Sequence, residues 1–436
     1  MSNKNANTVE PHLKIYKDRS ILVDNLGREQ IFKEGAPNEL TLARQKKIMA
    51  ALDNGFLEKI IQECKNPELV KVNLSVADIS LLDSLVSAVT SEVGRAIVGL
   101  SILQLCVKAI EPSQNIRLHK AGRGEFSWQD GLSMRTLDSK YITPILRKHS
   151  LLRVNKDGIM MTRSLAENYP YSQLYKAAIR GAKKEWIELI DRLESKVLDA
   201  KDGLKVLIIA LMRRSEAFLV LTCVIEADLK KFLSTLPGPE LITELIKKHI
   251  DNSTYSARLM EIALHSLFQV HAEHGVINGV LKPLSQMRSA NKKHGNVADI
   301  EVVSPTNSLH IIEAWDSKYG KPYLRDELDE LSEKLEMHPE TEIACFVVNV
   351  EPDLRDDITQ RMEEIASIHN THIRLLSFDS FVKQELQRAG IENTAHYAIR
   401  WLTIYVESLS QKRRELAPID EPCDEWLQNL QKMLLI

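Results

Sequence analysis

The sequence has little of what marks secreted, membrane-spanning or zinc-finger proteins. Its five cysteines are an odd number, and no two of them form a Cys-x-x-Cys pair. This pattern argues against a disulfide framework or a zinc finger and indicates reduced thiols. Aromatic residues make up only 6% of the chain, and neither glycine nor proline is enriched, so we expect no long disordered or fibrous segment.

Long hydrophobic runs are also missing. The first residues, MSNKNANTVEPHLK, lack the apolar stretch that a signal peptide requires. The most apolar window, Val206–Met212, is too short to span a bilayer. We therefore expect a soluble, cytoplasmic protein with no membrane partner.

Two common catalytic signatures are absent from the sequence. It contains neither the phosphate-binding loop G-x-x-x-x-G-K-[ST] nor the nucleophile elbow G-x-S-x-G. We therefore expect neither a dependence on ATP nor a serine nucleophile of the esterase type.

What is present is the composition of an ordinary globular protein. With 436 residues, 44% hydrophobic and 27% charged, the chain is long enough for two or three domains. Pro237–Gly238–Pro239 is the clearest linker signal. We divide the chain into a mixed segment 1–76, a mainly helical region 77–238 and a third region 239–436.

Residues 136–163 carry a pattern found in DNA-binding units. Residues 136–152 indicate a helix with Pro144 near its start or at a kink, and residues 152–163 indicate two short strands around the turn Asn155–Gly158. The order helix, helix, basic hairpin is that of a winged helix, whose second helix usually enters the major groove. The alternative is a helix–hairpin unit that packs a core without touching DNA.

Beyond the linker the pattern alternates between helices and strands. Ser256–Glu273 has the spacing of an amphipathic helix, and two strand-like runs follow at Val297–Val303 and Leu309–Trp315. Helices and strands then alternate to residue 389, which predicts an α/β sheet with helices on its faces. The continuously apolar run Ile343–Val350 predicts a central strand covered on both sides.

The two strand-like runs carry charge that a hairpin does not need. Side chains two residues apart on a strand share a face, so Asp316 and Lys318 share one, and Asp299 lies on the strand before them. If the two faces coincide, Asp299 and Asp316 converge beside the Lys318 ammonium. Buried charge is costly unless it is paired or holds a metal, and Mg²⁺ is bound by one or two carboxylates with water and phosphate oxygens.

Two further acids of the hairpin leave alternatives open. Glu313 lies three residues before Asp316 and is out of phase with it on a regular strand. A bulge near Ala314–Trp315 would bring both carboxylates inward, and without one Glu313 faces elsewhere, toward a base or a lysine. Glu301, in phase with Asp299, is a further candidate for the metal site.

This arrangement resembles the core of the PD-(D/E)XK nucleases, and more narrowly a type II restriction endonuclease with an added helical DNA-binding region. The likeness rests on Asp299, on Asp316–Ser317–Lys318 after one strand and turn, and on the flanking order of helix, hairpin, helix, strand and helix. It covers roughly residues 256–389. It departs from the family in one position, since Ala298 precedes Asp299 where the motif has proline.

The resemblance implies roles for individual residues. Asp299 and Asp316 would be the ligands of Mg²⁺, with the carbonyl of Ser317 as a third, and Lys318 would be the catalytic lysine. Glu261 stands on the preceding helix where some members place an extra acid. Glu313 is kept with the candidate catalytic residues because its position on the hairpin is open. The family also implies cleavage of a phosphodiester to leave a 5′-phosphate.

A net charge of −3 hides two basic segments that are candidates for DNA contact. Both could meet phosphates or base edges, with arginine to guanine and asparagine to adenine as the usual pairings. In both cases the alternative is a solvated basic loop. The candidates are Lys282, Arg288, Asn291, Lys292 and Lys293 beside the hairpin, and Arg117, His119, Lys120 and Arg123 in the helical region.

The sequence thus predicts a Mg²⁺-dependent, sequence-specific endonuclease of double-stranded DNA. The fold expected is an α+β nuclease core in the C-terminal part, with a mainly helical, winged-helix-like region before it. A palindromic target would favour a homodimer. The alternatives are a DNA-binding regulator of the winged-helix type whose sheet is only a scaffold, and a nuclease that acts on branched DNA or RNA.

Overall fold

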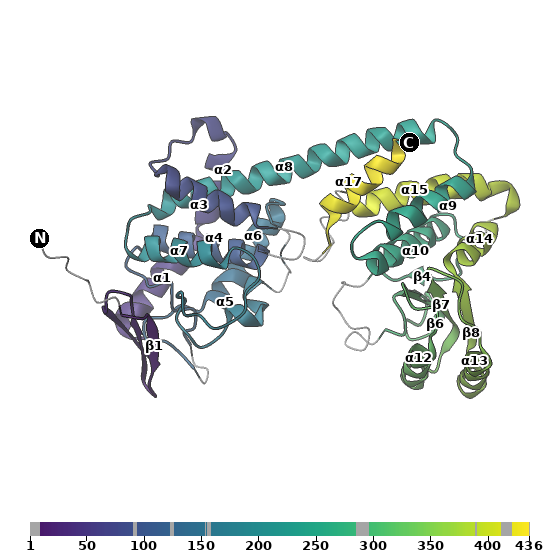
Figure 1. Ribbon diagram of the computed structural model, residues 1–436, viewed down its shortest axis with the longest axis horizontal. Helices are drawn as coiled ribbons and strands as arrows, with labels where there is room; N and C mark the ends of the chain where they lie inside the picture. The colour runs from purple at the N-terminus through teal and green to yellow at the C-terminus, as the bar shows by residue number, and fades with distance from the viewer. Residues whose placement is uncertain are drawn as a thin grey trace, which may run out of the picture. The chain divides into compact units, whose positions relative to one another are not determined.

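The chain folds into two compact units in a computed structural model. The structure describes residues 9–89, 94–122, 126–152, 154, 158–284, 296–388, 390–410 and 421–435. The first unit ends at Ala217 and the second begins at Phe218, within the long helix α8 (Ala200–Leu233) (Figure 1). The predicted linker Pro237–Gly238–Pro239 lies inside the second unit, where it joins α8 to the next helix.

The first unit opens with a three-stranded antiparallel sheet in the order β1-β2-β3. Its strands are β1 (His12–Ile15), β2 (Arg19–Val23) and β3 (Glu29–Lys33). A turn joins β2 to β3, and the Asp24 carboxylate holds it by accepting bonds of 2.9 Å from the backbone N–H groups of Leu26 and Arg28. Gly27 has a φ of +73°, which residues with a side chain rarely adopt.

The rest of the first unit is helical and encloses one hydrophobic core. Leu81 and Leu85 of α3 are buried in that core, as is Val89 just after the helix. Trp186 is fully buried and donates from its indole N–H to the buried Gln104 side chain at 2.8 Å. The helices are α1 (Glu39–Asp53), α2 (Phe56–Cys64), α3 (Val76–Ser87), α4 (Arg95–Ile110), α5 (Met134–Leu137), α6 (Thr143–Lys148), α7 (Lys183–Glu194) and the first part of α8.

The predicted hairpin of the winged helix is not formed by the residues described in that segment. Ile159–Met161 is a 3-10 turn, and another follows at Arg163–Leu165, where a second strand was expected. The reason is Asp138, whose buried carboxylate accepts from the backbone N–H groups of Ile159 at 2.5 Å and Met160 at 3.1 Å. The turn residues 155–157 lie outside the described part of the chain, and Pro144 stands in the first turn of α6 as expected.

The second unit is built on a five-stranded mixed sheet in the order β4-β5-β6-β7-β8. The first three strands pair antiparallel, and β6, β7 and β8 pair parallel. The strands are β4 (Val280–Leu281), β5 (Ile300–Val303), β6 (Ile311–Lys318), β7 (Thr341–Val348) and β8 (His372–Ser377). The apolar β7 is an interior strand, as its sequence predicted, and Ala344 to Val348 are all buried.

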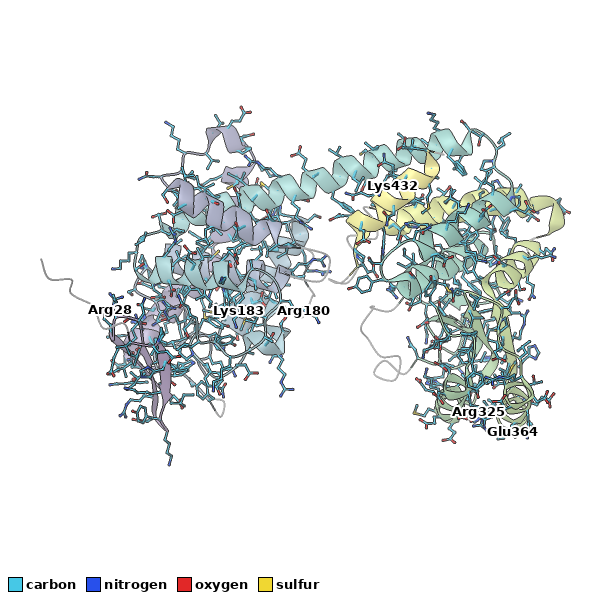
Figure 2. All side chains as sticks on the ribbon, viewed as in Figure 1. Arg28, Arg180, Lys183, Arg325, Glu364 and Lys432 are labelled. Carbon is cyan, nitrogen blue, oxygen red and sulfur yellow. The ribbon has the colours of Figure 1, made fainter. Side chains whose placement is uncertain are left out.

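Helices cover both faces of this sheet (Figure 1). One face contributes Trp315 and Val347 to a core shared with α10, α14 and α15, and the other contributes Ala314 and Phe346 to a core shared with α12 and α13. Figure 2 marks Arg325 on α12 and Glu364 on α13, part of the charged surface of that second layer. The helices are α9 (Pro239–Asp251), α10 (Ser256–Glu273), α12 (Arg325–Met337), α13 (Asp356–His369), α14 (Phe378–Arg388), α15 (Thr394–Leu409) and α17 (Cys423–Leu434).

The predicted α/β class is therefore confirmed at the level of a mixed sheet with helices on both faces. Among the described residues, none of the helices combines the length and hydrophobicity needed to cross a membrane.

Candidate functional site

The strands β5 and β6 bring the predicted acids together. Ile300 pairs with Trp315 and Glu301 with Ala314, so Asp299 comes opposite Asp316 when the register is continued by one residue. Alternation along both strands puts these two carboxylates on the same face of the sheet. The Asp299 carboxylate also contacts β6 directly, because the backbone N–H of Ser317 donates to its Oδ2 at 3.1 Å.

The surroundings of Asp316 disfavour the ionised form of its carboxyl group. Its side chain is buried, and Nζ of Lys318 lies 2.8 Å from Oδ2. Burial, together with the nearby Asp299 carboxylate, raises the pKa of Asp316 to about 7, although Lys318 acts to lower it. Oδ1 of Asp316 is buried, and no described residue donates a hydrogen bond to it. The ammonium of Lys318 therefore does not fully offset burial and the neighbouring charge at the two carboxylates of Asp299 and Asp316.

Lys318 is held in its ammonium form. Burial acts to lower its pKa, but the carboxylates of Asp316 and Asp299 outweigh burial and leave the pKa above its ordinary value. A lysine that is protonated at neutral pH is a source of positive charge and hydrogen bonds, not a base.

Glu261 on α10 lies close enough to act on the same cluster. Burial raises its pKa, Arg258 lowers it, and the charges of Asp316 and Lys318 act on it as well. Its carboxylate pairs with the buried guanidinium of Arg258, one turn earlier on α10, and Arg258 also donates to Glu421 at 2.9 Å. Glu261 is thus within electrostatic reach of Asp316 and Lys318, with its charge partly neutralised by Arg258.

Glu301 supports the backbone that carries Asp299. Its buried Oε1 accepts from the N–H of Val297 at 2.6 Å and from the N–H of Ala298 at 3.3 Å, and its Oε2 lies 2.6 Å from Nζ of Lys282. These bonds fix the turn that leads into β5. Lys282, predicted to contact DNA, is therefore engaged by Glu301, although its side chain is about one third exposed (35%).

Glu313 is not brought to the cluster. The register shift between β5 and β6 lies at Val302/Val303, not at Ala314–Trp315, so the strand is regular from Glu313 to Asp316 and the two side chains take opposite faces. Arg388 of α14 binds the Glu313 carboxylate through both terminal nitrogens, at 2.5 and 3.0 Å, and the Trp315 indole donates to it at 3.0 Å. Glu313 therefore binds an arginine of α14, and neither a place in the metal site nor the expected base or lysine partner is found for it among the described residues.

The carbonyl of Ser317 points to the same side as its N–H, because both groups of a residue in an extended strand face the same neighbour. Since that N–H donates to Asp299, the carbonyl also faces the strand that carries Asp299. The hydroxyl of Ser317 is buried, and no described residue is hydrogen-bonded to it.

The residues present fit a hard divalent cation of the kind predicted. In the described part of the chain, no group of three or more histidine, cysteine or acidic side chains is arranged to hold a metal ion. Mg²⁺ requires fewer protein ligands, because water and phosphate oxygens complete its coordination. Asp299 and Asp316 supply two carboxylates, and the unsatisfied Oδ1 of Asp316 is an acceptor that a cation would satisfy.

The predicted DNA-contacting residues of the first unit are placed differently from one another. Arg117 is buried, where it donates to the carbonyl of Tyr171 at 2.9 Å and to the carboxylate of Asp191 at 2.5 Å. His119 is buried and stacks on Tyr171 with ring centroids 4.4 Å apart, and burial lowers its pKa to about 3. Because neither side chain reaches solvent, we leave both out of the proposed contact with DNA.

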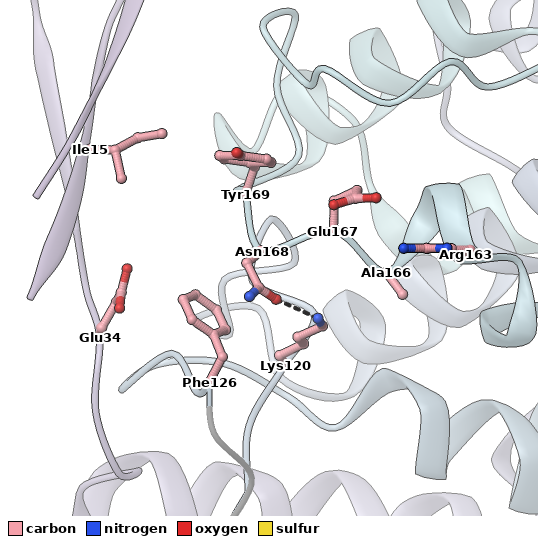
Figure 3. Close-up of a pocket in the computed structure, with 9 residues that line it drawn as sticks. All are labelled: Ile15, Glu34, Lys120, Phe126, Arg163, Ala166, Glu167, Asn168 and Tyr169. Carbon is pink, nitrogen blue, oxygen red and sulfur yellow. Dashed lines mark hydrogen bonds between the residues drawn. The ribbon is translucent and has the colours of Figure 1, made fainter. Parts of the chain in front are cut away.

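Lys120 lines a cavity that neither Arg117 nor His119 lines. Its ammonium donates to the side-chain oxygen of Asn168, and both residues line a hollow in the first unit (Figure 3). The remaining candidates, Arg123, Arg288, Asn291, Lys292 and Lys293, lie outside the described residues.

Sequence reasoning missed three contacts of this site. Arg258 and Arg388, which pair with Glu261 and Glu313, lie on helices, and no local spacing links them to the hairpin. Glu301 was weighed as a metal ligand, whereas its oxygens are used by the backbone and by Lys282. Its position two residues after Asp299 indicated that the two acids share a face, but it did not indicate a bond from Glu301 to the backbone.

Comparison with known proteins adds no assignment. No protein-family model matches the chain, and a search of curated proteins found no match.

Proposed function

We propose that the chain is a Mg²⁺-dependent endonuclease that cuts double-stranded DNA at specific sequences, in the manner of a type II restriction enzyme. The observation that carries this proposal is the convergence of Asp299, Asp316 and Lys318 on one face of the β5–β6 pair. Apart from the two-residue strand β4 after α10, the order α10–β5–β6–α12–β7–α13–β8–α14 around it is the order expected of a PD-(D/E)XK core.

In this proposal Asp299 and Asp316 hold the cation, with the Ser317 carbonyl beside them. A bound Mg²⁺ would polarise the phosphodiester and lower the pKa of a bound water. The Lys318 ammonium, held by Asp316 at 2.8 Å, is positioned to stabilise negative charge that develops on the phosphate. Glu301 keeps the turn before β5 in place, and so keeps Asp299 opposite Asp316.

The Arg258–Glu261 pair gives this site a second layer of charge. Glu261 acts electrostatically on Asp316 and Lys318, and its ion pair with the buried Arg258 offsets the cost of burying its charge. In this proposal the pair supports the cluster, and Glu261 becomes a direct ligand only if Arg258 releases it.

The proposal is tested by incubating supercoiled plasmid with the purified full-length protein in Mg²⁺ and, separately, in a chelator. Wild type is expected to nick or linearise the plasmid in Mg²⁺ only. Lys318→Ala and Asp316→Asn are expected to lose cleavage by a factor of about 10² or more, as removal of a group that stabilises transition-state charge does.

Lys383→Ala is the matched control, because Lys383 is an exposed lysine on α14. It should cut as wild type does. Intact plasmid in every reaction, or equal cutting by wild type and Lys318→Ala, would contradict the proposal.

The same reactions separate the other functions considered. A DNA-binding regulator would retard duplex DNA in a gel but leave it uncut in Mg²⁺. A nuclease for branched DNA or RNA would cut a four-way junction or an RNA hairpin, and would leave a linear duplex of the same sequence whole.

A further inference from the structure

The first unit contains a hollow of about 430 Å³ that the proposed cleavage site does not use. It lies between the N-terminal sheet and the segment that follows α6 (Figure 3). Ile15 and Glu34 line one side, and Arg163 lies on the other (Figure 3). The lining residues are Ile15, Glu34, Lys120, Phe126, Arg163, Ala166, Glu167, Asn168 and Tyr169.

The two cations of this pocket are not paired with carboxylates in the described residues. Lys120 donates to the neutral amide oxygen of Asn168, and burial lowers its pKa although the charge of Glu167, in the same lining, acts to raise it. Arg163 is exposed, and no hydrogen bond or ion pair of its guanidinium is found among the described residues. Arginines elsewhere in the unit, such as Arg117 and Arg192, bind acids directly. The exposed guanidinium of Arg163 is therefore available to an anion.

Two aromatic rings line the same pocket. Phe126 is held edge-on by the buried Trp128, with ring centroids 4.9 Å apart. One lysine ammonium lies over each ring, that of Lys176 5.6 Å from the centroid of Tyr169 and that of Lys120 5.9 Å from the centroid of Phe126. The opposite face of such a ring is a surface on which a nucleobase can stack, because every base has a π-face.

The remaining groups suit the edge of a base. The side-chain amide of Asn168 has an oxygen that accepts from Lys120 and an NH₂ group that can donate to a base. Figure 3 shows it beside Lys120, with the rings of Phe126 and Tyr169 on either side. Glu34 and Glu167 supply carboxylates, which accept from exocyclic amines such as N4 of cytosine. Two acids in the lining also disfavour a bare anion, so phosphate alone should bind less well than a nucleotide.

We propose that this pocket binds one nucleotide, with its base against Phe126 and Tyr169 and its phosphate at Lys120 and Arg163. The chemistry is that of a nucleoside 5′-phosphate, either free or within a DNA strand. The site is separate from the Asp299–Asp316 cluster, and the proposal does not depend on cleavage.

The test is calorimetric titration of the full-length protein with the four deoxynucleoside 5′-monophosphates, each without divalent cations. We expect at least one to bind, and to bind more tightly than its unphosphorylated nucleoside and than inorganic phosphate. Tyr169→Ala should weaken that binding about tenfold or more, since stacking on an aromatic ring carries much of a base's affinity. Arg163→Ala should remove the preference for the nucleotide over the nucleoside.

Tyr169→Phe and Lys59→Ala are the matched controls. The first keeps the ring and should keep binding, and the second removes an exposed lysine of α2 away from the pocket. Lack of binding by all four nucleotides, or binding that Tyr169→Ala and Arg163→Ala leave unchanged, would overturn the proposal.

A second arm distinguishes the two sources of the nucleotide. If the pocket takes a nucleotide from DNA, a short single strand should bind more tightly than the monophosphate, and Tyr169→Ala should weaken both. Lys318→Ala should bind nucleotides as wild type does. Nucleotide binding without cleavage would therefore contradict the endonuclease alone, and cleavage unaffected by Tyr169→Ala with no nucleotide binding would contradict the pocket alone.

Discussion

Asp316 is a carboxylate that its own environment disfavours. Burial and Asp299 raise its pKa to about 7, and the 2.8 Å contact with Lys318 offsets them only in part. The pKa in the unfolded chain is near the ordinary 3.8, so the folded protein binds more protons than the unfolded chain between about pH 4 and 7. The charge of Asp316 therefore lowers stability as pH rises through that interval, and the loss is complete above it.

The first prediction concerns Asp316→Asn in the absence of divalent cations. The neutral isostere should be more stable than wild type at about pH 8, by on the order of 1 kcal/mol or more, because it removes the disfavoured charge. The difference should shrink toward zero near pH 4, where Asp316 of wild type is protonated. Urea unfolding at the two pH values measures it. A variant less stable than wild type at both would show that the carboxylate is not strained.

The second prediction concerns the addition of Mg²⁺ to the same proteins. At about pH 8 a ligand at a hundredfold excess over its dissociation constant stabilises the folded state by about 2.7 kcal/mol. Mg²⁺ should therefore raise the thermal midpoint of wild type and, much less, that of Asp316→Asn. Equal shifts in both proteins would mean that the cation binds elsewhere.

The third prediction concerns Glu301, which acts through the turn that carries Asp299. Glu301→Ala should reduce cleavage at low Mg²⁺ and recover much of it at high Mg²⁺, because it misplaces a ligand without removing one. Asp299→Ala should not be rescued in this way. Mg²⁺ titrations of the cleavage rate compare the two, and identical curves would contradict a positioning role.

Among the elements, β6 is held to α14 by a pair of opposite charges. Glu313 is buried, and Arg388 binds it through two nitrogens. Loss of Arg388 leaves the buried Glu313 carboxylate without its cation, and an unpaired buried charge costs several kcal/mol. The Trp315 indole still donates to that carboxylate and so reduces the penalty.

The fourth prediction is that Arg388→Leu lowers the free energy of unfolding by about 2 kcal/mol. The double variant Glu313→Leu/Arg388→Leu should be more stable than Arg388→Leu, because it leaves no unpaired carboxylate. Urea unfolding of the two variants and wild type decides this. If the double variant is the less stable of the two, Glu313 is not held mainly by Arg388.

Elements were predictable from sequence where the pattern is local. The structure has α10 at Ser256–Glu273, the predicted bounds, and β7 begins at Thr341, two residues before the apolar run that predicted it. Period-two alternation also sufficed to bring Asp299 opposite Asp316 and to put Lys318 beside it. These results depend only on residues close together in the chain.

The rest depends on partners far away in the sequence. Arg117 is buried against Asp191, which lies 74 residues later in the chain. Glu313 is paired with Arg388, which lies 75 residues later. The strand expected at residues 159–163 is replaced by a turn because Asp138 captures the backbone of Ile159. No spacing rule specifies such pairs, since they form only when helices pack.

At the scale of the whole molecule, the homodimer expected from the sequence requires an exposed apolar surface through which two copies can associate. Leu219, Val220 and Val224 are 42%, 59% and 41% exposed on α8, and Cys223 beside them is exposed while the other four cysteines are buried. An antiparallel copy of α8 centred on Cys223 would set Leu219 against Ala227, Val220 against Glu226 and Cys223 against Cys223 of the other chain. Such a centre also sets the exposed Glu216 of one copy against the exposed Lys230 of the other.

The fifth prediction is that the protein is a dimer by light scattering and that Val220→Glu shifts it to monomer. Mild oxidation should join two wild-type chains through Cys223, and Cys223→Ser should abolish that product. Val197→Glu, at a valine that is 67% exposed on the first unit, should leave the dimer intact. A monomer at all concentrations would remove the dimer from the account.

The central claim is that Asp299, Asp316 and Lys318 form a Mg²⁺ site that cuts duplex DNA at defined sequences. Its most direct measurement is the digestion of a phage genome of known sequence by wild type and Lys318→Ala, followed by mapping of the ends. We predict a fixed set of fragments whose 5′-phosphate ends share one short sequence, with no fragments from Lys318→Ala. A genome left whole by Mg²⁺-saturated wild type, or fragments with no sequence in common, would contradict the account.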